Sequence, residues 1–242
     1  MAEPANGSRI VALGHHQPEG ILDNEQLTKL VDTNDEWIRS RTGIVTRHVA
    51  GDDETVPDMA IAAAEKLMAF TDYTDRTTCV LTADGAGAAL VERSDTRDIG
   101  PVLWGSAPDL APAVRIEPPT QKFAQDGRAV YRWALSRGPE HAREAIVRSG
   151  LDPSDIAVLV THQANLRIIQ PVAESLDLED RIVVTDVVES GNTSAASIPL
   201  GLSKWWHAGK IPPGVPALLF GFGGGFAYAA QVVRTPALPA TT

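Results

Sequence analysis

The sequence predicts a layered α/β fold, and two observations support this prediction. Apolar runs of strand length alternate with amphipathic stretches of helix length along the chain, a pattern typical of packed sheet and helix layers. A glycine-rich pattern near residue 85 also recurs near residue 223, which indicates two related halves. With 242 residues, 43% of them hydrophobic, the chain can bury a core as one large domain or two small ones.

The first part of the chain predicts mixed short elements. We expect a strand at Arg9–Gly14 and two short helices in "NEQLTKLVD" and "NDEWIRSR". A stronger helix is predicted over Val56–Ala69, which is Ala-rich with apolar residues three and four apart. The string "TTCVLTADGAGAALVER" then predicts a strand, a glycine turn and a second strand.

The second part alternates more regularly. A helix is predicted up to Gly150, and a later helix tolerates Pro171 only near its first turn. A third helix should end at Gly209, before a closing strand, glycine turn and strand. The strings are, in order, helix "RAVYRWALSRGPEHAREAIVRSG", strand "DIAVLV", helix "LRIIQPVAESL", strand "RIVVTDV", helix "TSAASIPLGLSKWWHAG" and hairpin "VPALLFGFGGGFAYAAQVV".

The internal repeat suggests that the two halves differ in length. "VLTADGAGAAL" superposes on "LLFGFGGGFAY", which aligns Gly85 with Gly223 and Gly87 with Gly225. Each copy follows an Ala/Glu-rich helix, but only the second has a long intervening stretch with two strands and two helices. Either the halves diverged or a βαβα segment is missing from the first. We therefore predict two halves, 1–98 and 99–242, with an apparent internal deletion at 69/70.

Composition excludes several function classes. A net charge of −10 argues against nonspecific nucleic-acid binding, which needs a basic surface. No apolar run reaches the length of a membrane span, and the polar start lacks the apolar core of a signal peptide. Cys79 is the one cysteine, so an internal disulfide or a cysteine-based zinc site is excluded. We expect a cytoplasmic protein.

Five motifs together resemble a known enzyme family. They stand in the order found in β-ketoacyl-acyl carrier protein synthase III (ketosynthase III) enzymes of the thiolase superfamily, and the resemblance covers nearly all of Arg9 to Arg234. These enzymes join an acyl-CoA starter to malonyl-acyl carrier protein. The resemblance implies a five-layered α-β-α-β-α fold built from two similar halves, the first truncated here. The motifs are "DEWIRSRTGI", "DRTTCVLTADGAGAALV", "HQANLRII", "GNTSAASIPL" and "FGFGGGF".

One departure from the family concerns the nucleophile. The family's catalytic cysteine begins a helix in the first half, within the segment that is absent between Ala69 and Phe70. Cys79 matches a different family position, in the strand before the glycine hairpin. The nucleophilic cysteine is therefore absent from this sequence.

The resemblance assigns catalysis to His162, Asn192 and the backbone of Gly224. Decarboxylation of a malonyl thioester builds negative charge on the thioester oxygen, and two neutral N–H donors suit its stabilisation. A lysine would instead pair with the malonyl carboxylate. The Gly224 amide would serve an oxyanion hole for acyl transfer, because glycine lets backbone approach a ligand closely.

Each of these residues also has a structural interpretation. His162 could cap the helix at Leu166, and Asn192 in "GNTS" is a good turn or N-cap residue. Glycine hairpins like Gly223–Gly225 are common. Cys79, among apolar residues, fits a buried inert thiol. Metal binding is not expected, since the adjacent His15 and His16 have no evident third ligand.

Substrate-binding residues follow from the same resemblance. Trp37 and Arg41 match the positions that meet the CoA adenine and phosphates, by stacking and by a guanidinium; the alternative is an amphipathic helix with one buried Trp. Asn165 is a candidate donor to the pantetheine arm. Carrier proteins are acidic, so Arg167, helped by Arg132, would offer a positive docking spot, unless it is simply a solvated arginine. The implied docking residues are Gln163, Ala164, Asn165, Leu166, Arg167 and Arg132.

The expected function is a cytoplasmic, homodimeric acyltransferase that acts on acyl-CoA and malonyl-acyl carrier protein in fatty acid or polyketide biosynthesis. It should need no metal or redox cofactor, and neither nucleic acid nor membrane is an expected partner. A first alternative is a starter-loading or ester-forming acyltransferase of secondary metabolism. A second is a nucleophile-free remnant that binds CoA or a carrier protein.

Overall fold

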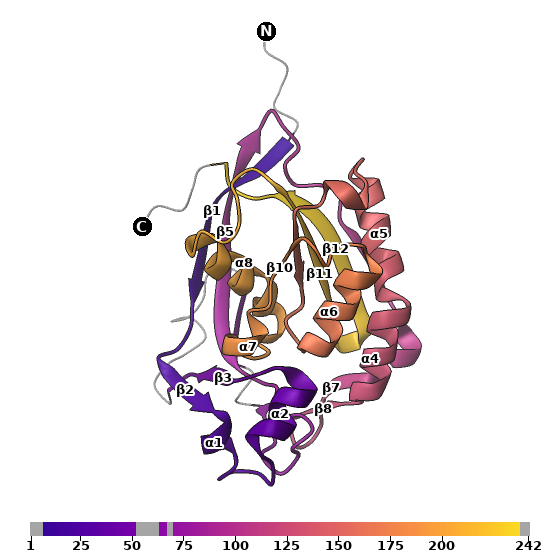
Figure 1. The fold of residues 1–242 in the computed structure, drawn as a ribbon. Coiled ribbons are helices and arrows are strands. Elements are labelled where there is room, and N and C mark those ends of the chain that lie inside the picture. Colours follow the sequence, from indigo (N-terminus) through magenta and orange to yellow (C-terminus); the bar gives the residue numbers. More distant parts are fainter. Residues whose placement is uncertain (1–6, 52–62, 67–69, 238–242) are drawn as a thin grey trace.

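Two sheets of unequal size, with a helix between them, organise the chain (Figure 1). The computed structural model describes residues 7–51, 63–66 and 70–237. The strands are β1 (Gly7–His16), β2 (Gly20–Asp23), β3 (Thr46–Val49), β4 (Ala63–Lys66), β5 (Asp84–Ser94), β6 (Leu103–Ser106), β7 (Val114–Glu117), β8 (Lys122–Gln125), β9 (Val158–Thr161), β10 (Ile182–Val183), β11 (Pro216–Gly223) and β12 (Ala227–Arg234). The helices are α1 (Asn24–Leu27), α2 (Asp35–Thr42), α4 (Gly127–Ser136), α5 (Gly138–Arg148), α6 (Leu166–Ser175), α7 (Val187–Ser190) and α8 (Ser197–His207).

The larger sheet has the strand order β10-β9-β11-β12-β6 and is covered on one face by α4, α5 and α6 (Figure 1). Strand β9 is buried throughout and runs parallel to β10 and β11. Burial on both faces explains why "DIAVLV" is a continuous apolar run rather than an alternating one. The predicted closing hairpin is confirmed as β11 and β12, which pair antiparallel.

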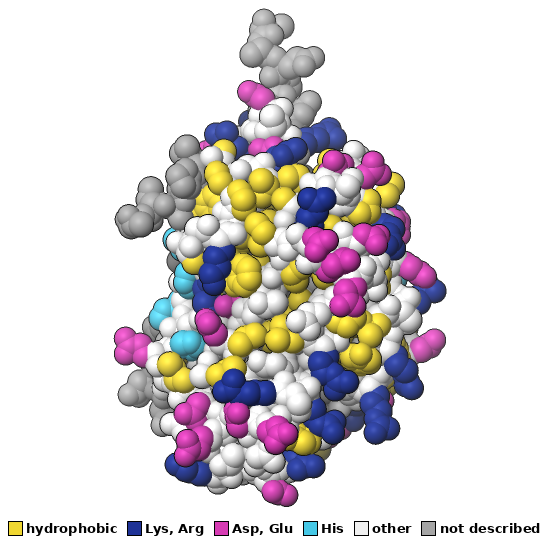
Figure 2. Space-filling model, viewed as in Figure 1, with side chains coloured by type: hydrophobic (Ala, Val, Ile, Leu, Met, Phe, Trp, Pro, Cys, Tyr) yellow, Lys and Arg dark blue, Asp and Glu magenta, His cyan; other side chains and the backbone are white. Residues whose placement is uncertain are grey.

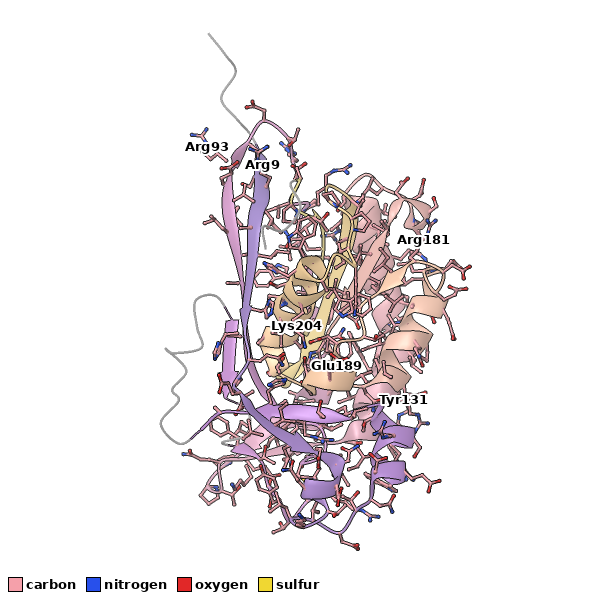
Figure 3. All side chains as sticks on the ribbon, turned by 60° about the vertical axis from the view of Figure 1, so that its left-hand side comes forward. Arg9, Arg93, Tyr131, Arg181, Glu189 and Lys204 are labelled. Carbon is pink, nitrogen blue, oxygen red and sulfur yellow. The ribbon has the colours of Figure 1, made fainter. Side chains whose placement is uncertain are left out.

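Helix α8 forms the middle layer between this sheet and the β1–β5 pair. Its Leu202 and Trp206 pack in one buried cluster with Ile10 and Leu13 of β1 and with Val160 of β9. Figure 3 shows α8, which carries Lys204, between the two sets of strands. The outer helices, the larger sheet, α8 and the smaller sheet therefore follow one another as layers.

The first-half glycines serve close packing, and the glycine hairpin predicted there is wrong. Strand β5 runs without a turn through Gly85 and Gly87. A Cβ atom on Gly87 would lie 2.4 Å from the Leu200 nitrogen of α8, so only glycine permits this approach. Cys79 also lies in a turn before β5 and not in a strand.

Three further expectations need correction. Within the predicted helix Val56–Ala69, the described residues Ala63–Lys66 form a strand that pairs with β5, so pairing overrides the local helix propensity of these residues. The rest of that helix lies outside the described residues. The helix predicted up to Gly150 is two helices, since Pro139 cannot continue α4. Pro171 lies beyond the first turn of α6, where burial of Ile168 and Val172 holds the helix.

The two main sheets differ in size. Among the described residues, the smaller sheet has the order β1-β5-β4, three strands against five in the larger sheet. Because Gly87 aligns with Gly225, the end of β5 corresponds to β12. We compare β1 with β6, since β1 pairs antiparallel with β5 and β6 pairs antiparallel with β12. Helix α8 covers β1 and β5. Among the described residues no helix covers the equivalent face of β12 and β6, where Trp104 is 81% exposed. The join between Ala69 and Phe70 itself lies outside the described residues.

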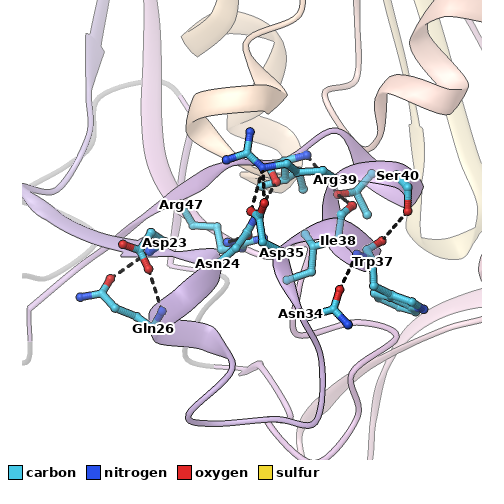
Figure 4. A network of polar contacts seen from close by, with 12 residues as sticks. Asp23, Asn24, Gln26, Asn34, Asp35, Trp37, Ile38, Arg39, Ser40 and Arg47 are labelled. Atoms are coloured by element: carbon cyan, nitrogen blue, oxygen red, sulfur yellow. Dashed lines mark hydrogen bonds and ion pairs between the residues drawn. The ribbon is translucent and has the colours of Figure 1, made fainter.

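A buried arginine ties the first-half loops together (Figure 4). Arg47 is fully buried, and its Nε and Nη2 donate to the Val80 carbonyl oxygen at 3.0 and 2.8 Å. Its Nη1 donates to Asn24 Oδ1 at 2.8 Å, and Asn24 Nδ2 in turn donates to Asp35 Oδ1 at 2.7 Å. This network fixes α1, α2 and the turn before β5 relative to one another.

We expect Arg47→Met to lower the free energy of unfolding by about 3 kcal/mol, because it leaves the buried Val80 and Asn24 oxygens without donors. Urea denaturation followed by circular dichroism measures this. Arg39→Met is the control, since the Arg39–Asp35 ion pair is half exposed and should contribute about 0.5 kcal/mol. Equal losses in both variants would contradict the structural role of Arg47.

Candidate active site

A cavity of about 570 Å³ lies at one edge of the larger sheet and is lined by His162, Asn192 and Gly224. Strands β9 and β11 are parallel, so their carboxyl ends share an edge, and His162 and Gly224 directly follow them. Such an edge is where α/β sheets place ligand sites. From it, the cavity extends over the uncovered face of β12 and β6, past Trp104 and Gln231.

His162 is fixed on three sides. Its backbone N–H donates to the Phe220 carbonyl oxygen at 2.7 Å, and its ring meets the Phe222 ring edge-on with centroids 5.8 Å apart. Nδ1 lies 2.7 Å from the hydroxyl oxygen of Ser197, the first residue of α8. Desolvation by burial lowers the pKa of His162 to about 4, so its imidazole is neutral at pH 7. Since Asn165 caps α6, the capping alternative for His162 is excluded.

Asn192 is held with its amide group in one orientation. Its backbone N–H donates to Leu81 O at 2.9 Å, and its backbone oxygen accepts from Ala83 N at 2.9 Å. Side-chain Oδ1 accepts the Ser194 N–H at 2.9 Å. Because a backbone N–H can only donate, this bond requires Oδ1 on that side and directs Nδ2 away from it. Nδ2 has no hydrogen-bond partner among the described residues.

Gly224 begins a short 3-10 turn between β11 and β12. Gly225 in this turn has a φ of 95°, which L-residues rarely adopt, so the turn depends on glycine there. A Cβ atom on Gly224 would meet nothing nearer than the Val114 oxygen at 3.8 Å. The backbone of Gly224 is therefore open to the cavity.

The loop after His162 contains both buried and exposed residues. Gln163 is 1% exposed; its Nε2 donates to Thr161 O and Val184 O, and its Oε1 accepts from Val187 N. Its inclusion in a docking surface is therefore wrong, since a buried and fully bonded side chain cannot meet a partner. Ala164 lines the cavity, and Leu166 packs on the end of α2 at Gly43.

Asn165 connects this loop to α2. Its Oδ1 accepts from Arg167 N, and its Nδ2 donates to the Arg41 carbonyl oxygen, both at 2.9 Å. One of its two amide hydrogens is thus committed to structure, and the other is available to a ligand.

Arg167 and Arg132 are both exposed, on α6 and α4. The Arg167 guanidinium lies 6.0 Å from the centre of the Tyr131 ring, which Figure 3 places on α4. Figure 2 shows basic side chains gathered at the lower right of the molecule, where α4 and α6 reach the surface. A local basic surface therefore exists on an acidic chain.

Two guanidiniums flank Trp37. Arg41 and Arg76 each lie 4.9 Å from the centre of its ring. Trp37 is partly buried, and it does not line the cavity. Sequence reasoning missed Arg76, because no local spacing indicates that the turn before β5 folds back onto α2. It also missed Ser197, although that residue lies within the "GNTSAASIPL" motif.

Cys79 is fully buried and does not line the cavity. Desolvation, with a smaller contribution from Asp75, raises the pKa of its thiol to about 11. At neutral pH it is therefore a thiol and not a nucleophilic thiolate. Within the described part of the chain no group of His, Cys, Asp and Glu is arranged to hold a metal ion. None of the described helices combines the length and apolarity needed to cross a bilayer.

Comparison with known proteins shows the family. The family model described as 3-oxoacyl-[acyl-carrier-protein] synthase III matches residues 52–108, and the model of its C-terminal part matches residues 146–235. Beta-ketoacyl-[acyl-carrier-protein] synthase III 4 of Streptomyces coelicolor is 44% identical, with 95% of this chain and 99% of the relative covered. The mycobacterial beta-ketoacyl-[acyl-carrier-protein] synthase III of Mycobacterium marinum is 30% identical over 94% of this chain and 95% of its own.

Solved structures give the same architecture. A priming β-ketosynthase from a polyketide biosynthetic pathway superposes with a TM-score of 0.90 at 27% identity, and 98% of each chain is covered. The 3-oxoacyl-[acyl-carrier-protein] synthase III of Aquifex aeolicus has a TM-score of 0.88 at 27% identity, covering 94% of this chain and 100% of its own. The predicted thiolase-like fold is thereby confirmed.

The alignment with the Streptomyces coelicolor relative also reveals a difference. It runs over 313 positions, more than the 242 residues of this chain, although 95% of the chain is aligned. The relative therefore carries an internal stretch that has no counterpart here. With both halves of the family pattern matched and the fold shared, the chain belongs to the 3-oxoacyl-[acyl-carrier-protein] synthase III family.

Proposed function

We propose that this chain carries the malonyl-decarboxylating site of a β-ketoacyl-acyl carrier protein synthase III type acyltransferase. The overall reaction is the decarboxylative condensation of an acyl-CoA starter with malonyl-acyl carrier protein in fatty acid or polyketide biosynthesis. One observation carries the proposal: His162, Asn192 and Gly224 all line one cavity.

The chemistry requires donors that carry no charge. As the malonyl carboxylate leaves as CO₂, its bonding electrons form an enolate on the thioester oxygen. An imidazole N–H of His162 and the Nδ2 of Asn192 would stabilise this oxygen. A neutral imidazole, kept so by its low pKa, does not form an ion pair with the carboxylate that must leave. The Gly224 N–H would stabilise the oxyanion formed during acyl transfer.

In this proposal, none of the 242 residues supplies the thiolate that accepts the starter acyl group. Cys79 is buried and protonated, and the family relatives carry an internal stretch that this chain lacks. Two features support its placement beside the cavity. Helix α8 covers one face of β1 and β5, and the equivalent face of β12 and β6 is exposed at Trp104. The buried Thr193 hydroxyl has no hydrogen-bond partner among the described residues. We propose that the lacking stretch covers this face and supplies the cysteine.

The substrates are proposed to bind on the α2 and α6 side. Stacking on Trp37 with charge from Arg41 and Arg76 suits the adenine and phosphates of CoA. Arg167 and Arg132 would attract an acidic carrier protein. We place the reaction in the cytoplasm, where both substrates occur, and expect a homodimer, as the resemblance implies. Use of the same site for starter loading in secondary metabolism stays an alternative.

The nucleophile proposal predicts the outcome of acyl-CoA labelling. After incubation with acetyl-CoA, intact-protein mass spectrometry should show no acetyl adduct on the 242-residue chain. A chimera with the extra stretch of the Streptomyces coelicolor relative inserted between Ala69 and Phe70 should gain one acetyl group, because it restores a cysteine beside the cavity. The adduct should vanish when that cysteine is changed to serine and persist in Cys79→Ser. Acetylation of Cys79 in the original chain would refute the proposal.

The donor proposal predicts the effect of removing the Asn192 amide hydrogens. Asn192→Asp keeps the acceptor for Ser194 N–H but has no N–H donor, so decarboxylation of malonyl-CoA should slow by about 100-fold or more. Release of CO₂ measures the rate. Asn192→Ala, which also loses the Ser194 contact, should be at least as slow. An unchanged rate in Asn192→Asp would remove Asn192 from the site.

The CoA proposal predicts that Trp37→Ala weakens CoA binding by about 1–2 kcal/mol through lost stacking. Arg76→Met should also weaken it, whereas Arg39→Met, on the same helix as Trp37 but without contact to its ring, should not. Isothermal titration measures all three. Equal affinity in every variant would assign Trp37 to the core alone.

A further inference from the structure

Ser197 contacts the ring of His162 and does not itself line the cavity. It is 1% exposed and begins α8, and its Oγ is 2.7 Å from His162 Nδ1. The same Oγ accepts the backbone N–H of Gln163 at 3.1 Å. Three groups therefore share this buried contact: one backbone donor, one hydroxyl and one ring nitrogen.

The hydrogens available at this contact decide the tautomer of His162. A serine hydroxyl has one hydrogen and two lone pairs, and Gln163 N–H occupies one lone pair. If Nδ1 carried the ring hydrogen, it would take the second lone pair. The Ser197 hydrogen would then need another acceptor, and the described residues offer none within hydrogen-bond distance. If Nδ1 is unprotonated, the hydroxyl donates to it and every group is satisfied.

The neutral state of the ring sharpens this choice. Desolvation lowers the pKa of His162 to about 4, so at neutral pH the ring holds a single hydrogen. Hydrogen on one nitrogen then means a lone pair on the other. His162 lines the cavity, and its Nε2 has no hydrogen-bond partner among the described residues.

We propose that Ser197 is a positioning residue, which donates its hydroxyl hydrogen to His162 Nδ1 and so fixes the ring hydrogen on Nε2. This inference rests on the proposed function and deepens it. An Nε2–H would donate to the developing enolate oxygen, whereas the opposite tautomer would place a lone pair against that negative charge. Ser194 has a similar effect on Asn192: its backbone N–H donates to Asn192 Oδ1 and so orients the side-chain amide.

The tautomer can be read directly by two-dimensional ¹H–¹⁵N NMR of the histidine rings in the full chain. Wild type should show His162 protonated at Nε2 at pH 7, with a titration midpoint near pH 4. Ser197→Ala should shift His162 toward the Nδ1–H tautomer, and Ser197→Thr, which keeps a hydroxyl, should restore Nε2–H. Ser203→Ala is the matched control, because Ser203 is buried on the same helix and contacts His15 Nδ1 at 2.9 Å.

The kinetic readout uses malonyl-CoA as the probe. Ser197→Ala should lower kcat for decarboxylation by about 10-fold with little change in KM, as expected when an oriented donor is lost in the transition state only. Ser203→Ala should leave kcat unchanged. Nδ1–H in the wild type, or unaltered Nε2–H and kcat in Ser197→Ala, would overturn the assignment.

The two proposals fail separately. If wild type does not decarboxylate malonyl-CoA, the proposed function fails, while the NMR spectra still decide whether Ser197 sets the tautomer. If Ser197→Ala does not fold, the wild-type spectrum and the spectrum of Ser197→Thr decide the same question.

Discussion

The close approach of α8 to β5 at Gly87 is the contact on which the site depends. A side chain there would overlap the backbone of α8 at Leu200, so glycine alone lets the middle layer pack against the smaller sheet. The first residue of α8 is Ser197, which lies against His162, and the loop leading into α8 holds Asn192. A shift of this helix would therefore displace both polar residues from the edge of the larger sheet.

Both proposed donors have one end bonded to the protein, and both residues line the cavity. Asn192 is oriented by a backbone N–H and His162 by a hydroxyl, while burial keeps the imidazole neutral. Such pre-arranged dipoles do not have to reorient as charge develops on a substrate oxygen, which is why they stabilise it more than water does. In the proposed function, this arrangement would stabilise a negative oxygen beside a group that must leave.

The described parts of the two halves contribute unequally to this cavity, and Cys79 does not line it. The second half supplies His162, Asn192, Gly224 and the covered outer face of the sheet. The described part of the first half supplies strands β1 to β5, of which β1, β4 and β5 form the smaller sheet, and a buried thiol; it provides no helix opposite α8. Trp104 is 81% exposed on the face of β12 and β6 that no described helix covers, so a large apolar side chain meets solvent there.

The sequence by itself determined the layered α/β class, the strand at Val158–Thr161, the closing hairpin and the family, because these depend on local periodicity and on motifs in a fixed order. It also singled out His162, Asn192 and Gly224. Only the tertiary structure decided that β5 passes through its glycines without turning, that Ala63–Lys66 is a strand, that Gln163 is buried and that Arg76 reaches Trp37. Each of these depends on contacts between residues far apart in the chain, such as α8 against Gly87, and local propensity carries no information about such contacts.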